Sequence, residues 1–134
     1  MVLPLLLVLV FGIIEAGWFF AQQVEVRNAA REGARLAVVD FPGPDMGDSS
    51  EILAETCARA DLSGDGVTIT IVKNDGTSTG PEDDTAIVTV SHPYQSLTGF
   101  IPGFDDAVIE STVEMRSERD ELTWTDIATP TACP

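Results

Sequence analysis

Histidine and cysteine, the side chains that most often bind metals or act as nucleophiles, are scarce in this sequence. His92 is its only histidine, and its two cysteines, Cys57 and Cys133, lie far apart along the chain. One imidazole and two distant thiols do not supply the four ligands of a zinc site. Phosphate-binding loops and nucleophile-elbow motifs are also absent. We therefore expect no enzyme activity, no cofactor and no small-molecule substrate.

One short segment has the spacing of a calcium site. The run Asp61-Leu-Ser63-Gly-Asp65-Gly66 resembles the first half of an EF-hand loop, with three oxygen ligands followed by the sharp-turn glycine. The bidentate glutamate that should close the loop is replaced by Val72, and a strand is expected where a helix should follow. A polar helix-to-strand turn explains the segment better, so Asp61, Ser63 and Asp65 are only a weak metal-site candidate.

The charge of the chain excludes one class of partner. It carries 22 acidic and 7 basic residues, for a formal net charge of −15. Such a surface repels nucleic acids and anionic membrane surfaces. We therefore expect no nucleic-acid binding.

Residues 1–21 form an apolar block whose single charge is Glu15. A helix from Val2 to Ala21 would span ~30 Å, the thickness of a bilayer's hydrocarbon core. The alternatives are a cleaved signal peptide and a buried core helix. No basic residue precedes the block, as it would in a signal peptide, and a domain this small could hardly surround such a helix. We predict a transmembrane helix.

Glu15 is unusual within that block. A carboxylate deep in a bilayer costs about 2.5–3.5 kcal/mol on insertion scales, so such residues usually face protein. We expect Glu15 to face another helix in an assembly. The alternatives are that it is protonated, or that the helix is shifted so that it lies near the membrane interface.

Residues 22–40 continue the same helix in polar form. Small and branched residues recur on one face and permit close packing of a helix or a sheet; they are Val26, Ala29, Ala30, Gly33 and Ala37. Arg27, Arg31 and Arg35 form a stripe on another face, where like charges repel one another. We expect these arginines to meet lipid headgroups, the acidic domain or a neighbouring subunit, although a solvated face fits equally well.

The remaining residues, 41–134, predict a small α+β domain. Residues 50–62 read as a short helix capped by Ser49 or Ser50, after a Pro- and Gly-rich break. Alternating and β-branched residues predict antiparallel strands at 66–73, 85–92 and 107–118, with a possible fourth at 121–127. Three or four strands are too few to stand alone, so the polar half of the long helix should cover this sheet.

Cys57 and Cys133 bear on the side of the membrane that the domain occupies. In an exported domain they would form one disulfide, whereas two free thiols would suit a cytoplasmic domain. Three arginines follow the apolar block and none precedes it, which by the positive-inside rule places the domain in the cytoplasm. We favour the outside, because the beginning of the sequence looks incomplete.

The N-terminal third resembles a known family. The apolar run followed by RNAAREGARLAVV is similar to the N-terminal region of TadE-like proteins, minor pilins or pilin-like proteins of the tight-adherence (Flp) branch of type IV pili. The segment VTVSHPYQSLTGF also looks like a strand end common in such proteins. The residues that carry the match are Pro4, Glu15, Gly17, Ala30, Arg31, Gly33 and Arg35.

The resemblance implies a function, a location and partners. Such proteins insert in the bacterial cytoplasmic membrane with the domain outside, and they build or prime an adhesive filament. Their partners are other pilin subunits and pilus assembly proteins, met through the N-terminal helix. The family's prepilin-peptidase site is missing from this sequence. Either the native start lies upstream, with a basic leader, or this protein is not processed, and we favour the first.

The residue pattern and the resemblance together divide the chain and assign roles to its residues. Residues 1–21 would be the transmembrane helix, 22–40 its polar continuation, and 41–134 the extracytoplasmic domain. Arg27, Arg31 and Arg35 would make subunit or domain contacts.

A second function is compatible with the sequence. The protein could be a membrane-tethered binding module that grips its partner with an apolar loop containing Phe100, Ile101 and Phe104. The same loop could instead be a lid over the sheet's core, and we favour that interpretation.

Overall fold

The computed structural model describes residues 2–39, 49–60, 66–74, 85–99, 107–117 and 126–133. Within these ranges the chain forms two helices and a four-stranded antiparallel sheet, which confirms the α+β class. The elements are α1 (Leu3–Val38), α2 (Ser49–Ala60), β1 (Thr68–Asn74), β2 (Thr85–Pro93), β3 (Val108–Arg116) and β4 (Ile127–Ala132).

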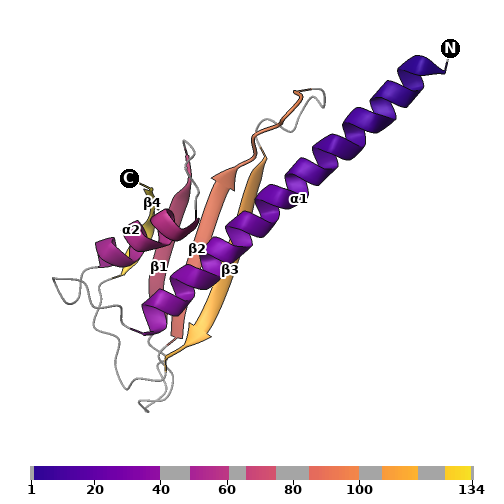
Figure 1. Cartoon of the computed structure of the whole chain (residues 1–134). Coiled ribbons are helices and arrows are strands. Elements are labelled where there is room, and N and C mark those ends of the chain that lie inside the picture. Colours follow the sequence, from indigo (N-terminus) through magenta and orange to yellow (C-terminus); the bar gives the residue numbers. More distant parts are fainter. Residues whose placement is uncertain are drawn as a thin grey trace.

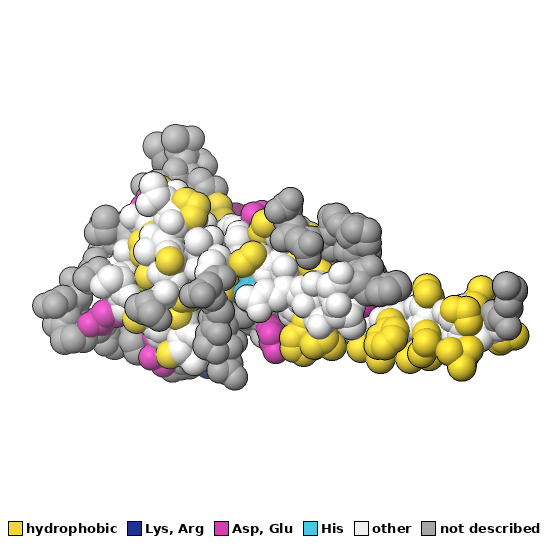
Figure 2. All heavy atoms as spheres, turned by 90° about the horizontal axis from the view of Figure 1, so that it is seen from above, with side chains coloured by type: hydrophobic (Ala, Val, Ile, Leu, Met, Phe, Trp, Pro, Cys, Tyr) yellow, Lys and Arg dark blue, Asp and Glu magenta, His cyan; other side chains and the backbone are white. Residues whose placement is uncertain are grey.

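Helix α1 is much longer than the domain that it covers. Its 36 residues begin with Pro4 in the first turn, where no intrahelical hydrogen bond is lost. The C-terminal half lies across the sheet, and the N-terminal part projects beyond it (Figure 1). Hydrophobic side chains cover this projecting part (Figure 2). By length and composition α1 could cross a membrane, and it is the one described helix that could.

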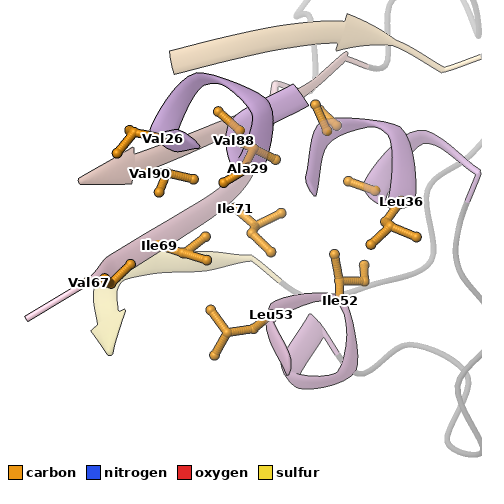
Figure 3. Close-up of a cluster of buried hydrophobic side chains, with 14 of the residues drawn as sticks. Val26, Ala29, Leu36, Ile52, Leu53, Val67, Ile69, Ile71, Val88 and Val90 are labelled. Carbon is orange, nitrogen blue, oxygen red and sulfur yellow. The ribbon is translucent and has the colours of Figure 1, made fainter. Parts of the chain in front are cut away.

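The sheet has the strand order β3-β2-β1-β4, and α1 packs on one of its faces. Alternate residues of β1 and β2 point towards the helix: Ile69 pairs with Val90 and Ile71 with Val88, and all four are fully buried (Figure 3). The other face is polar and carries a hydroxyl pair between Thr89 and Thr112 at 2.9 Å.

The predicted small-residue face of α1 is the face that meets the sheet. Its members are all buried, which confirms the helical periodicity. Gly33 marks the closest approach. A Cβ atom there would lie 3.0 Å from the Thr56 methyl group and 3.1 Å from a Val88 methyl group.

Helix α2 packs beside the C-terminal part of α1 and completes the core (Figure 1). Ile52 and Leu53 are buried against α1 and the sheet, and the Thr56 hydroxyl donates to the Ile52 carbonyl oxygen at 2.6 Å. Cys57 lies on the same helix and forms a disulfide with Cys133. The bond joins α2 to the residue that follows β4, as expected for an exported domain.

The fourth strand is not where the sequence placed it. We expected it at 121–127, but β4 runs from Ile127 to Ala132 and contains Pro130; residues 121–125 lie outside the described part. An edge strand tolerates a proline because one side of it needs no ladder hydrogen bonds. Contacts at both ends hold it: the Lys73 amide donates to the Asp126 carboxylate at 2.9 Å, and the Cys133 amide to the Val67 carbonyl at 3.1 Å.

The tight contact at Gly33 gives a stability prediction. A Gly33→Val substitution should lower the free energy of unfolding by about 1–3 kcal/mol, the usual cost of overpacking a core, because Thr56 and Val88 are buried and cannot move aside. Thermal unfolding in detergent, followed by circular dichroism, measures this. Gly17→Val is the matched control, since no described neighbour lies within 4 Å of a Cβ there. Equal melting temperatures for the two variants would contradict the packing.

The disulfide gives a second prediction. It closes a loop of sequence separation 76, and loop-closure entropy then stabilises the fold by up to about 4–5 kcal/mol. Replacing both Cys57 and Cys133 by Ala should therefore lower the melting temperature clearly. A reductant should lower that of the native protein to the same value and leave the double variant unchanged. A native protein insensitive to reductant would refute the role of the bond.

Candidate functional site

The chain that follows β2 returns to α1 and covers Glu15. After Pro93 it continues beside the helix towards its N-terminal half (Figure 1). Glu15 is 4% exposed, although its neighbours Ile14 and Ala16 are exposed. The only charged residue of the apolar block is therefore enclosed by its own chain.

Three residues of this loop donate hydrogen bonds to the Glu15 carboxylate. The Tyr94 hydroxyl and the Leu97 amide donate to Oε1, the latter at 3.2 Å. The Thr98 amide and hydroxyl donate to Oε2 at 3.1 and 2.7 Å. Both carboxylate oxygens thus accept two bonds each. We call Glu15, Tyr94, Leu97 and Thr98 the Glu15 clamp.

Other side chains of α1 bind the same loop one and two turns further along. The Trp18 indole N–H and the Gln22 amide both donate to the Gln95 carbonyl oxygen at 2.9 Å. The Gln95 amide donates back to the Gln22 side-chain oxygen at 3.4 Å. The Phe19 ring meets the Tyr94 ring edge to face, with centroids 5.5 Å apart. The loop is therefore fixed to α1 by polar and aromatic contacts together.

The local sequence explains why the chain leaves β2 at this point and lies against α1. Pro93 ends β2 because it has no amide hydrogen to continue the ladder. The Tyr94 amide donates to the Ala107 carbonyl at 2.7 Å, which holds the loop to the start of β3. Gly99 has a φ of 61°, a left-handed conformation that suits glycine and turns the chain away after Thr98.

Burial and the carboxylate act together on Tyr94. Removal from water, followed by the hydrogen bond to Glu15 and its negative charge, raises the pKa of the Tyr94 hydroxyl from its ordinary value of 10.0 to about 12. The phenol therefore stays protonated and remains a donor at any physiological pH.

Comparison with known proteins supports the resemblance stated above. A family model described as TadE-like protein matches residues 1–35. The N-terminal region of the chain is therefore similar to that of TadE-like proteins. No curated protein and no solved structure matches the chain. The TadE-like family implies a role in the tight-adherence pilus system, and it is a structural rather than a catalytic family.

The clamp changes the interpretation of Glu15. We expected the carboxylate to need another helix, because an unpartnered one is costly in a bilayer. Its partners come from the same chain, so that cost no longer requires a second helix. A role for Glu15 in assembly therefore stays a prediction that must stand on other grounds.

The sequence did contain a signal for the clamp. Glu15 precedes Val26 by eleven residues, which is about three helical turns, so it falls on the face that meets the sheet. Gln22 lies on the same face, seven residues after Glu15. What the spacing cannot show is that residues about eighty positions away supply the donors.

The predicted arginine stripe lies on the surface. Arg27, Arg31 and Arg35 are all exposed, and the last two line a shallow hollow with Met115 of β3. Acidic and amide groups of α1 share that hollow: Glu25, Asn28 and Glu32. The hollow thus offers both charges to a partner, and the role of the arginines stays a prediction.

The weak metal candidate cannot be placed. Asp61, Ser63 and Asp65 lie outside the described residues, and so do Phe100, Ile101 and Phe104 of the apolar loop. Within the described ranges, no three histidine, cysteine, aspartate or glutamate side chains gather as metal ligands would.

The clamp predicts the titration of Tyr94, which is the only tyrosine in the chain. The ultraviolet phenolate band of the folded protein should titrate at a pKa of about 12. Because the pKa is raised in the folded state, the stabilisation from Tyr94 is complete below about pH 10 and is lost as the pH rises to about 12.

Two glutamate variants test the cause of that shift. Glu15→Gln should lower the Tyr94 pKa, because it removes the charge, but not to 10.0, because burial remains the larger cause. Glu25→Gln, at an exposed position on the same helix, should leave the titration unchanged. A Glu15→Gln titration that matches the native one would show that the contact does not form.

Proposed function

We propose that this protein is a pilin-like structural subunit that assembles into, or primes, a tight-adherence (type IV) pilus for surface adhesion. In this proposal α1 anchors the chain in the bacterial cytoplasmic membrane and later packs against other pilin helices. The domain lies outside the membrane and then on the extracellular pilus. The partners are pilin subunits and pilus assembly proteins.

The observation that carries this proposal is the projecting part of α1. The large apolar side chains between Val2 and Ile14 are exposed on every side of the helix. A helix that is apolar all round belongs in lipid or among other helices. The match of the TadE-like model to this same segment favours the pilus system over a general anchor.

The disulfide supports the outward orientation of the domain. Disulfides persist in oxidising compartments and are rare in the cytoplasm. The pairing of Cys57 with Cys133 therefore favours an extracytoplasmic domain over the orientation that the arginine distribution alone predicts.

The division of the chain into 1–21, 22–40 and 41–134 belongs to the same proposal. The clamp adds one detail to it: the domain's contact with the helix begins at Glu15, inside the segment assigned to the membrane. Glu15 would serve assembly indirectly, because the clamp fixes the direction in which the domain leaves the helix.

The proposed contact between subunits at the arginines can be tested without disturbing the membrane anchor. Arg31 and Arg35 line the hollow beside Met115, where a neighbouring acidic domain would find both apolar and positive groups. Each copy carries a net charge of −15, so the two arginines would offset part of the repulsion between copies at this face.

Deletion and complementation in the native bacterium test the proposal. Loss of the gene should abolish surface filaments and adhesion. An Arg31→Glu/Arg35→Glu variant should reach normal levels in the membrane fraction but restore few filaments, because it replaces the positive groups of this face by negative ones and adds to the repulsion between copies. Arg116→Glu, at an exposed position on β3, is the matched control and should restore both.

Two results would contradict the proposal. Normal filaments in the deletion strain would exclude a role in building or priming the pilus, and would favour the membrane-tethered binding module. Full rescue by the double arginine variant would remove these residues from the assembly contact.

A further inference from the structure

We propose that the loop Tyr94–Gly99 and the adjoining end of the domain form a second membrane-binding surface, which rests in the interfacial layer of the bilayer beside α1. The partner is the lipid surface itself. The inference depends on the membrane anchor of the proposed function, and it adds that the domain, as well as the helix, touches lipid.

Exposed apolar side chains lie on the loop, on the adjoining turn of α1 and at the start of β3. Leu97 is 55% exposed and Phe20 is 61% exposed, although both are large and apolar. Val108, equally exposed, lies at the same end of the sheet, since it pairs with Pro93 just before the loop. Hydrophobic side chains also cover the projecting part of α1 that leads up to this end of the domain (Figure 2).

The position of the loop along the axis of α1 places it close to the lipid. The Leu97 amide lies 3.2 Å from the Glu15 carboxylate, so the loop is level with the residue that follows Ile14. Ile13 and Ile14 are exposed and apolar, and covering them with hydrocarbon is part of anchoring the helix. Any placement that does so moves the loop to the boundary of the hydrocarbon layer.

Backbone groups of the loop have the hydrogen-bond partners that a position next to hydrocarbon requires. Non-helical chain near hydrocarbon is tolerated only where its polar groups are satisfied by protein. The amides of Leu97 and Thr98 donate to Glu15, and the Gln95 amide and carbonyl bond to side chains of Gln22 and Trp18. The Glu15 clamp is therefore what allows this loop to lie against lipid.

The side chains of the contact also suit an interface. Tyrosine and tryptophan with one apolar and one hydrogen-bonded end are typical of the boundary between membrane and water. Trp18 has this arrangement, because its ring is 41% exposed while its indole N–H donates to the Gln95 carbonyl oxygen. Residues 94–99 contain no aspartate, glutamate, lysine or arginine, so an uncharged lipid surface is sufficient.

Depth measurements on the full chain test the inference. An environment-sensitive fluorophore is attached at Leu97→Cys, at Leu7→Cys or at Val39→Cys, with the native disulfide intact, in phosphatidylcholine vesicles. Lipids brominated near the headgroup report contact with the interface, and aqueous iodide reports exposure to water. Leu7 is the lipid control, and Val39 is an exposed apolar residue at the opposite end of α1.

We expect headgroup-brominated lipid to quench the probe at Leu97 several times more strongly than the probe at Val39. Iodide should quench in the reverse order. A Leu97 probe that behaves like the Val39 probe, while the Leu7 probe is in lipid, would overturn this inference and leave the anchor intact. A Leu97 probe shielded from both quenchers would overturn it as well, in favour of a protein contact. If the Leu7 probe also lies in water, the membrane anchor itself fails.

Discussion

The carboxylate of Glu15 sets the arrangement of this protein, because a charge inside an apolar helix must find partners wherever the helix is placed. Four hydrogen bonds from one loop meet that need. The bonds work in both directions: they make the carboxylate tolerable inside the apolar segment, and they satisfy amides of a loop that has no strand or helix to pair with. Removing either side would leave the other unsatisfied.

The clamp also connects the two parts of α1. One half of the helix is fixed to the sheet by close packing at Gly33, where only a hydrogen atom fits between helix and core. The other half projects with its apolar surface exposed. The clamp lies at the junction of these two halves. The domain is therefore attached to α1 both at the clamp and at Gly33, which fixes its direction relative to the helix. A subunit whose domain leaves its helix in a fixed direction is suited to a regular assembly, and that geometry is what the proposed pilus role needs.

The far end of the domain depends on covalent rather than packing constraints. Strand β4 is an edge strand with a proline and few buried side chains, and β1 alone pairs with it. Its ends are held by Asp126 and by the residue that joins α2 through the disulfide. The disulfide therefore secures the part of the fold with the weakest core, which supports the proposed location of the domain outside the membrane.

The sequence by itself determined the long helix, its apolar and small-residue faces, three of the four strands and the likeness of its N-terminal region to TadE-like proteins. These features depend on periodicity and composition, which are local properties. It did not determine the position of β4, because a proline-containing edge strand has no alternating pattern and is held by distant contacts. It gave the face on which Glu15 lies but not its partners, since Tyr94 and Thr98 reach the carboxylate only when β2 packs along α1. Tertiary structure alone decided that the charge in the helix is satisfied within its own chain.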